Sequence, residues 1–126
     1  MQGALRSAGL EPGDISFINA HGTGTENNDL TESKAMLRLF GSKVPLFTST
    51  KSYTGHTLGA AGAVEAVYSI LNLVNGEIYG ALNFDEPIEG TGLQPVRSFR
   101  KAGLQHVMSN SFGFGGNCTS LVFSAA

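Results

Sequence analysis

The segment STKSYTGHTLGAAGAVEAVYSILNLV, residues 49–74, joins a polar loop to a long run of apolar residues. From Thr57 to Val74 the apolar and small side chains leave almost no polar face, which predicts a buried helix surrounded by protein. Glu65 is the one charged residue in that run. An unpaired carboxylate in such a setting is costly, so we expect Lys51, at the start of the segment, to be its partner.

The polar loop 49–56 leads directly into the expected helix, and His56 lies just ahead of the helix start. Backbone N–H groups and the helix dipole favour negative charge at that end of a helix. We therefore interpret the loop as a place that can hold an anion.

Composition limits the class of protein. A chain of 126 residues, 41% hydrophobic and 14% charged, is a globular piece of one domain at most. A net charge of −2 and the lack of a Lys/Arg cluster give no reason to propose nucleic acid or a membrane surface as a partner.

The single cysteine, Cys118, excludes an internal disulfide framework and fits a reducing cytoplasm. The helix at 57–74 is too short and too rich in Ala and Gly to predict a membrane span, and Met1 opens no secretory leader. We expect a cytoplasmic protein.

The first part of the chain alternates strands with helices. We expect a short helix at 1–9, a buried strand at 15–20 and, after the glycine-rich loop His21–Thr25, a helix at 28–40. Asn28 or Asp29 is the expected N-cap of that helix and Gly41 its C-cap. A second strand at 46–50 leads into the loop before the apolar helix. Strand, polar loop and helix thus occur twice, which is typical of an α/β unit with parallel strands and a site at their carboxyl ends.

The last part of the chain is less regular. Residues after Gly76 predict a surface loop of about twenty residues, with a weakly indicated strand at 79–82. Two further strands are expected at 106–110 and 119–124, joined by the glycine-rich segment 111–117.

Three segments together resemble the β-ketoacyl-acyl carrier protein synthases. They are Asn19–Thr25 (NAHGTGT), Ser49–His56 (STKSYTGH) and Asn110–Gly116 (NSFGFGG), in that order, with Glu65 fourteen residues after Lys51. The resemblance covers the whole chain but only the C-terminal half of such a synthase. It implies a thiolase-like α/β fold, in which this chain is one half of an α-β-α-β-α architecture, and it places residues 1–126 in a single domain.

The resemblance also implies catalytic roles. His21 and His56 match the two histidines that assist decarboxylation of a malonyl thioester in this family, and two imidazole N–H donors would stabilise the enolate oxygen that forms. Lys51 matches the family's lysine at the catalytic site, and Glu65 would hold it. The reaction implied is decarboxylative condensation of malonyl-acyl carrier protein with an enzyme-bound acyl group, in fatty acid or polyketide synthesis.

Substrate and partner expectations follow from the same resemblance. Thr23 and Thr25 match hydroxyls along the pantetheine arm, and Phe114 matches an aromatic gate beside the acyl pocket, with Phe112 next to it. Without the resemblance, the two phenylalanines could equally be core aromatics. The implied partners are acyl carrier protein and the N-terminal synthase half, with a homodimer as the complete enzyme. No cofactor or metal is expected.

Departures from the family pattern restrict what the chain can do. The family's nucleophilic cysteine lies in the N-terminal half, and no stretch here resembles its surroundings. Cys118 is not a substitute, and we expect it to be a small buried hydrophobe. Asn117-Cys118 and Glu26–Asp29 differ from the usual motifs. A zinc site made of His21, His56 and Cys118 is disfavoured because no two of these ligands are closely spaced.

Three interpretations remain open. The chain is the C-terminal part of a ketoacyl synthase, or a separate subunit that completes a partner carrying the cysteine, or a non-catalytic module that binds acyl groups or the carrier. The first two predict a large exposed apolar patch on the lone chain.

Overall fold

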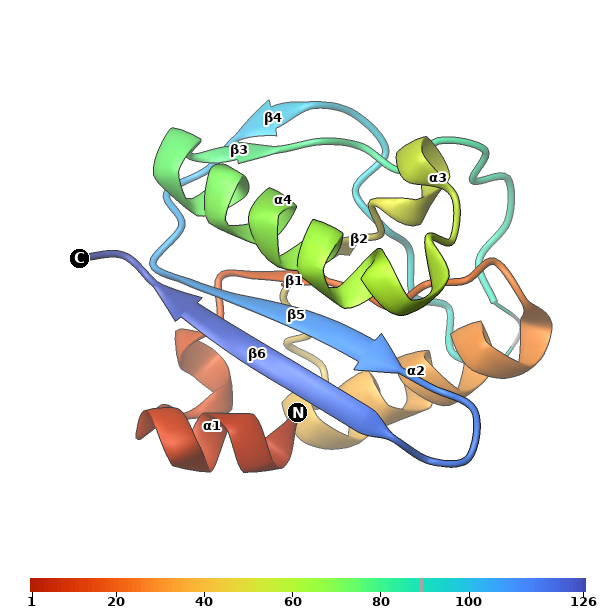
Figure 1. Cartoon of the computed structure of the whole chain (residues 1–126), viewed down its shortest axis with the longest axis horizontal. Coiled ribbons are helices and arrows are strands. Elements are labelled where there is room, and N and C mark those ends of the chain that lie inside the picture. The colour runs from red at the N-terminus through yellow and green to blue at the C-terminus, as the bar shows by residue number, and fades with distance from the viewer. Residues whose placement is uncertain (89) are drawn as a thin grey trace.

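A mixed four-stranded sheet forms the centre of the molecule. The structure is a computed structural model that describes residues 1–88 and 90–126. The strand order is β2-β1-β5-β6, and the strands are β1 (Phe17–Asn19), β2 (Leu46–Thr48), β5 (His106–Phe112) and β6 (Cys118–Ser124). β1 pairs in parallel with both β2 and β5, and β6 runs antiparallel to β5 (Figure 1). The parallel unit predicted from the sequence is confirmed, and the two C-terminal strands extend slightly beyond their predicted ranges.

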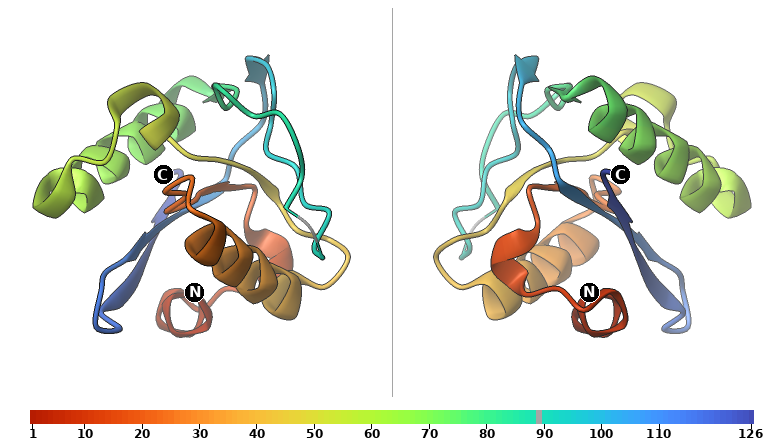
Figure 2. Two further views of the ribbon diagram at one scale, coloured as in Figure 1. Left: turned by 90° about the vertical axis from the view of Figure 1, so that its right-hand side faces the viewer. Right: turned by 90° about the vertical axis from the view of Figure 1, so that its left-hand side faces the viewer.

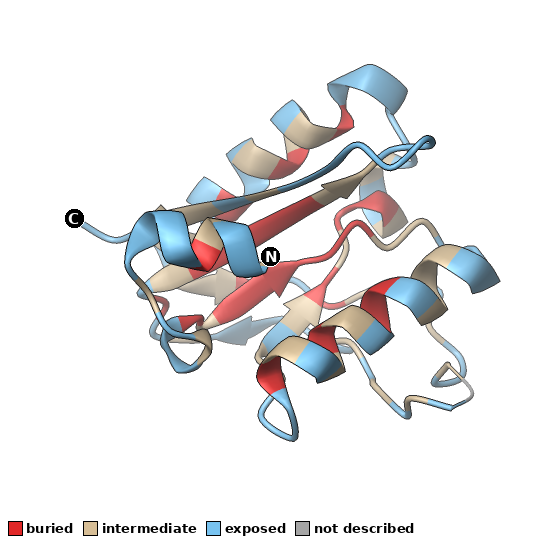
Figure 3. Cartoon of the chain, turned by 90° about the horizontal axis from the view of Figure 1, so that it is seen from below, coloured by how far each residue is buried: buried red, intermediate tan, exposed pale blue. Residues whose placement is uncertain are grey.

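Helices cover both faces of this sheet. α1 (Gln2–Ala8) and α2 (Glu26–Phe40) lie on one face and α4 (Ala61–Asn75) on the other, as the two side views show (Figure 2). Side chains alternate along β1, so that Ile18 packs toward α1 and α2 whereas Phe17 packs with Ile78 on the α4 side. The buried residues concentrate on β1 and β5 (Figure 3). Both central strands are therefore fixed by packing on two faces.

The helix boundaries agree only in part with the sequence prediction. α1 ends at Gly9, which is left-handed, and α2 ends at Gly41, both as predicted. The predicted N-cap of α2 is wrong, because Thr25 precedes the helix and its carbonyl already accepts the N–H of Asp29. A short helix, α3 (Lys51–Thr54), occupies part of the predicted polar loop, and Thr50 caps it instead of extending β2.

α4 has an unusual distribution of side chains. The prediction that protein surrounds this helix is wrong for its outer side, which is exposed in this chain. Its sheet-facing side buries polar side chains, namely Glu65, Ser69 and Asn72, together with Ala61. Its outer side exposes large apolar residues: Val67, Tyr68, Ile70, Leu71 and Val74. We call these five residues the outer face of α4. An amphipathic surface helix normally has the opposite arrangement.

The start of α4 also differs from the prediction. A turn of 3-10 helix, η2 (Leu58–Ala60), precedes α4, so the helix begins at Ala61 and not at Thr57. By length and composition alone, the stretch Leu58–Asn75 is the one helix in the described part of the chain that could cross a membrane. One such helix is weak evidence of a membrane span, and this one contains an ion-paired glutamate.

Residues after α4 form a long excursion along the edge of the sheet. β3 (Glu77–Ile78) and β4 (Arg100–Lys101) make a small antiparallel pair. The strand predicted at 79–82 is wrong, because regular pairing stops at Ile78 and Gly80 then lies directly against the backbone of Arg97. The loop character predicted for this region is confirmed.

Candidate active site

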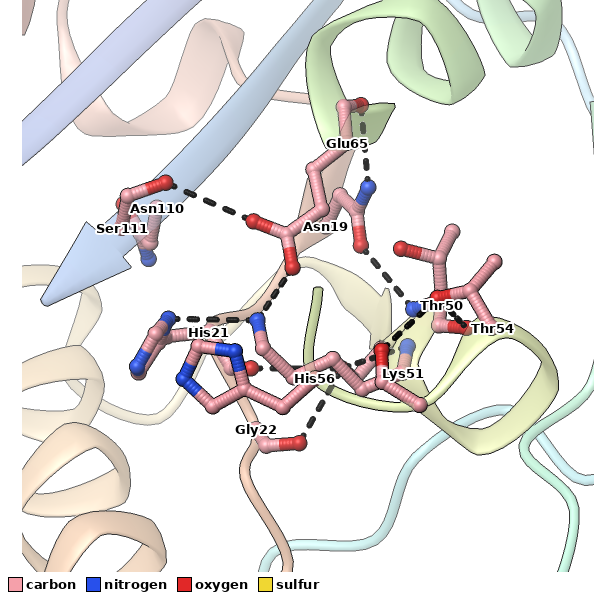
Figure 4. Close-up of polar contacts among 12 residues, drawn as sticks. Asn19, His21, Gly22, Thr50, Lys51, Thr54, His56, Glu65, Asn110 and Ser111 are labelled. Atoms are coloured by element: carbon pink, nitrogen blue, oxygen red, sulfur yellow. Dashed lines mark hydrogen bonds and ion pairs between the residues drawn. The ribbon is translucent and has the colours of Figure 1, made fainter. Parts of the chain in front are cut away.

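Two histidines from separate loops meet at the carboxyl end of the parallel strands. His21 follows β1, and His56 follows α3, which itself follows β2. Their ring centroids are 5.6 Å apart with the rings nearly perpendicular. His21 is buried and His56 is exposed in this chain. Parallel strands present their carboxyl ends at one edge, which explains how residues 35 positions apart in sequence become neighbours (Figure 4).

A buried ion pair holds the ring of His21. Lys51 Nζ pairs with Glu65 Oε1, and it lies 3.2 Å from Nδ1 of His21. Both partners of the ion pair are almost fully buried, and Ser111 Oγ donates to the second carboxylate oxygen of Glu65 at 3.4 Å. The predicted Lys51–Glu65 pair is confirmed. An ammonium group can only donate, so Nδ1 of His21 is the acceptor and the ring proton is on Nε2.

The ring of His56 has a matching arrangement. The backbone N–H of Leu58 donates to Nδ1 of His56 at 3.1 Å. Because a backbone N–H can only donate, the neutral ring carries its proton on Nε2. Leu58 has a positive φ of 52°, within the turn whose N–H reaches Nδ1 of His56. η2 separates His56 from the start of α4, and the anion site expected at this loop stays a prediction.

The surroundings of His21 keep it neutral. Burial, then the positive charge of Lys51, then His56 lower the pKa of His21 to about 4. The ring of Phe112 lies 5.6 Å from it and adds apolar cover. At neutral pH the uncharged ring of His21 can therefore act as a hydrogen-bond donor through Nε2–H.

The backbone beside His21 is fixed by a buried carboxylate that sequence reasoning missed. Glu32, on α2, accepts the backbone N–H groups of His21 at 3.0 Å and of Gly22 at 2.9 Å, and the side-chain N–H of Asn110 at 3.1 Å. Burial is the main cause that raises the pKa of Glu32, and these hydrogen bonds oppose it. Only its place near the start of a helix that follows the glycine loop could have drawn attention to it.

Asn19 is a second missed residue. It is buried at the end of β1, where its side chain accepts the N–H of Thr50 at 3.3 Å and donates to the carbonyl of Glu65 at 3.2 Å. It also lies 3.3 Å from the hydroxyl of Ser69. One amide thus joins β1, the turn that carries Lys51 and the helix that carries Glu65.

The residues predicted to contact substrate are spread more widely. Thr23 and Thr25 share a hydrogen bond of 2.9 Å between their hydroxyls, and Thr23 is half-buried. Phe112 lies on His21 as described, whereas Phe114 is fully exposed at the tip of the β5–β6 hairpin. The suggestion that Phe114 is a core aromatic is therefore wrong for this chain.

Cys118 does not take the buried position that we predicted. It is exposed at the start of β6, opposite Phe112 in the register, because β6 lies at the edge of the sheet and the hairpin tip projects from it. Within residues 1–88 and 90–126, no three His, Cys, Asp or Glu side chains gather as a metal site would require.

A cavity of about 510 Å³ adjoins the site on the α2 side. Its walls come from the loop after β1, from α2, from β2 and α3, and from the excursion between residues 81 and 95. Its lining includes Gly22, Thr23 and Ser49 beside the site, and Phe84 and Ile88 on the excursion. The pocket therefore lies next to the loop that carries His21.

Comparison with known proteins places the chain among ketoacyl synthases. The family model described as beta-ketoacyl synthase, C-terminal domain, matches residues 1–85. A 3-oxoacyl-[acyl-carrier-protein] synthase 2 of Vibrio harveyi is 43% identical over 127 residues, which covers 98% of this chain and 31% of that protein. A 3-oxoacyl-[acyl-carrier-protein] synthase 1 of Haemophilus influenzae is 49% identical over 112 residues, 86% of this chain and 27% of that protein.

A solved structure agrees with these matches. It is described as a type II PKS acyl-carrier protein in complex with its ketosynthase bound to the hexaketide, and it superposes with a TM-score of 0.94 at 29% identity. The match covers 99% of this chain and 31% of that one. The chain therefore spans less than a third of the length of these relatives, and its fold is that of their C-terminal half.

Proposed function

Because the chain belongs to the β-ketoacyl synthase family as its C-terminal domain, we propose that it supplies the two histidines for decarboxylative condensation of a malonyl group with an enzyme-bound acyl group. The observation that carries this proposal is the matched protonation of the two rings. Each Nδ1 faces a group that can only donate, so each ring keeps Nε2–H as a donor.

Two such donors suit the loss of carbon dioxide from a malonyl thioester. As the carboxylate leaves, negative charge develops on the thioester carbonyl oxygen. His21 and His56 would stabilise that charge by donating from Nε2, as an oxyanion hole does. Neutral rings are suited to this role, and the lowered pKa of His21 keeps its ring neutral. The carbanion would then attack an acyl thioester on a cysteine, with the thiolate as leaving group.

Lys51 and Glu65 would act on the site without reacting. Lys51 holds Nδ1 of His21 and thereby fixes both the tautomer and the ring orientation. Glu65 neutralises the buried ammonium. Thr23 and Thr25, on the segment between β1 and α2, would line the pantetheine arm of the carrier. Phe112 and Phe114 would border the acyl group. No cofactor enters this scheme.

The nucleophilic cysteine would come from another part of the synthase. Cys118 is exposed at the start of β6, an edge strand of the sheet, and the stretch around it does not resemble the surroundings of the family's nucleophile. We therefore expect the 126 residues to be inactive alone and to act with an N-terminal half, whether that half is part of a longer chain or a separate subunit. The outer face of α4 supports this, because large apolar side chains project from it. Acyl carrier protein would deliver the substrates, and the complete synthase would be a homodimer.

Reconstitution tests this proposal. The purified chain is mixed with a candidate N-terminal half that carries the cysteine, and release of carbon dioxide from malonyl-carrier is measured together with condensation. We expect both activities only in the mixture, and their loss with His21→Ala and with His56→Ala. His106→Ala is the matched control, because the His106 side chain hydrogen-bonds Ser124 and lies at the opposite end of β5 from the site. A complex that forms but neither decarboxylates nor condenses would refute the catalytic proposal and favour a module that binds acyl groups or carrier protein.

A further inference from the structure

The end of β5 contacts both carboxylates that hold His21. Asn110 and Ser111 are consecutive, so their side chains point to opposite faces of the sheet. Asn110 donates to Glu32 at 3.1 Å on the α2 side, and Ser111 donates to Glu65 at 3.4 Å on the α4 side. Glu32 holds the backbone of His21, and Glu65 holds its ring through Lys51. One strand end is thus linked to the histidine by two separate routes.

Asn110 is held on both sides of its amide. It is completely buried. Its Nδ2 donates to Glu32 Oε1, and its Oδ1 accepts the hydroxyl of Ser120, on β6, at 2.7 Å. The hydroxyl of Ser120 therefore fixes which way the amide is turned, with the donor group toward Glu32. Two residues beyond Asn110, β5 brings Phe112 against the His21 ring.

We propose that Asn110 is a positioning residue that acts through Glu32 on the backbone of His21 and Gly22. The catalytic importance of this role rests on the function proposed above, whereas the contacts themselves can be tested without it. Glu32 must accept two backbone N–H groups at once, one on each oxygen. It can do this well only as a carboxylate, because a protonated carboxyl group gives up part of its accepting capacity to its own O–H.

The donor of Asn110 favours the ionised form of Glu32. Burial disfavours that form, and the three N–H groups compensate. Removing one of the three would shift Glu32 toward protonation and loosen the loop of His21. The ionisable groups around Glu32 are His21 on the loop and four residues that line the same cavity: Asp29 on α2, Lys51 on α3, and Asp85 and Glu86 on the excursion. Three of these five groups are acidic, and a carboxylate cannot donate a hydrogen bond to Glu32 in place of Asn110.

The wild-type chain provides the first test. In a pH titration followed by ¹⁵N-resolved NMR, the backbone amide protons of His21 and Gly22 and the side-chain amide protons of Asn110 should shift together. We expect one common midpoint, above the ordinary value for a glutamate. If the Asn110 side-chain signals do not move with the two backbone amides, the proposed link through Glu32 is refuted.

Variants provide the second test. Asn110→Ala should move the common midpoint to higher pH and lower kcat of the reconstituted synthase about tenfold, with KM changed less than about twofold. Ser120→Ala leaves the donor in place but frees its orientation, so the midpoint should move the same way by less. Ser111→Ala is the control: it contacts Glu65 and should leave the midpoint unchanged. An unchanged midpoint in Ser120→Ala would overturn the proposal even if Asn110→Ala does not fold.

These readouts separate the two proposals. Normal titration without any condensation activity would count against the proposed function and not against the role of Asn110. Full activity with independent titration of the three signals would count against Asn110 alone.

Discussion

The ring of His21 shows how one residue's charge is set by its neighbours. Burial and two basic neighbours act in the same direction on it, and the pKa falls to about 4. A histidine with an ordinary pKa would be partly protonated at pH 6.5. Such a ring would carry a positive charge beside the Lys51 ammonium, so the neutral form suits this position.

We predict that His21 stays neutral down to about pH 4. In a ¹⁵N NMR titration, its ring should show the Nε2–H tautomer at neutral pH and should titrate with a midpoint of about 4. Because the folded-state pKa lies below the unfolded value, the contribution of this group to stability is present above pH 6.5 and is lost as the pH falls through about 4. His106 serves as an internal comparison on the same spectrum. A His21 midpoint at or above 6.5 would contradict the prediction.

We further predict that breaking the Lys51–Glu65 pair is strongly destabilising. Lys51→Ala leaves a buried carboxylate without its partner, which should lower the free energy of unfolding by about 3–5 kcal/mol. Replacing both residues at once, Lys51→Met with Glu65→Leu, should recover most of that loss while the histidine site stays inactive. Urea unfolding measures both. Lys101→Ala is the matched control, since the exposed Lys101–Glu77 pair is screened by solvent and should contribute little to stability. Equal losses in the two single variants would rule out this account.

The sequence predicts the Lys51–Glu65 pair but does not reveal Glu32. The difference lies in the residues that surround each glutamate in the sequence. A lone charge in an apolar run requires a partner, so Glu65 pointed to Lys51. Glu32 lies in a polar helix segment, where nothing in the local pattern marks it as buried. Its partners are two backbone N–H groups and a side chain 78 residues away, and such contacts appear only when the loop and β5 are placed. Resemblance to the family located the histidines, but their spacing and tautomers needed the folded chain.

At the scale of elements, the turn after β1 depends on a close approach of the Gly22 backbone to the side chain of Ser49. Gly22 has a φ of 43, and a Cβ at this position would lie 2.6 Å from Cβ of Ser49. Ser49 in turn donates to the carbonyl of Gly22 at 3.2 Å. The loop of His21 and the segment before α3 can therefore approach this closely because residue 22 has no side chain.

We predict that Gly22→Ala destabilises the chain by roughly 2 kcal/mol or more, since it combines a left-handed backbone with an overlap that Ser49 must relieve. The same variant should displace His21 and abolish decarboxylation in the reconstituted synthase. Gly13→Ala is the control, because no atom lies within 4 Å of its added Cβ and its φ is not positive. Chemical denaturation compares the two. Similar stabilities of the two variants would show that the turn accommodates a side chain.

The elements were predictable where their pattern is periodic and bounded by glycine. β1, α2 and the two C-terminal strands follow that rule, and their positions agree with the structure. The prediction of a strand at 79–82 is wrong. Its apolar residues Tyr79 and Leu82 are exposed, and Gly80 lies against the backbone of Arg97. The orientation of α4 about its own axis also could not be predicted from the sequence. A helix with apolar residues on nearly all sides does not show which side meets its own sheet.

At the scale of the whole molecule, the buried polar face of α4 and its apolar outer face are two parts of one arrangement. The polar face carries Glu65 and Ser69 into the site, where they meet Lys51 and Asn19. The outer face therefore has to carry the apolar residues, and it gains the hydrophobic free energy of burial only when another layer covers it. In the proposed synthase that layer would be the N-terminal half.

We predict that the outer face of α4 governs association of the chain. The wild-type chain alone should self-associate or be poorly soluble, and it should bind a candidate N-terminal half in analytical ultracentrifugation. Leu71→Asp should make the lone chain monomeric without lowering its stability, because this side chain is 46% exposed, and it should abolish binding to the N-terminal half. Leu82→Asp is the matched control: Leu82 is 47% exposed but lies outside α4, so both association properties should remain. A wild-type chain that is a monodisperse, cooperatively melting monomer would refute the prediction, since the outer face would then be stable in water with nothing covering it.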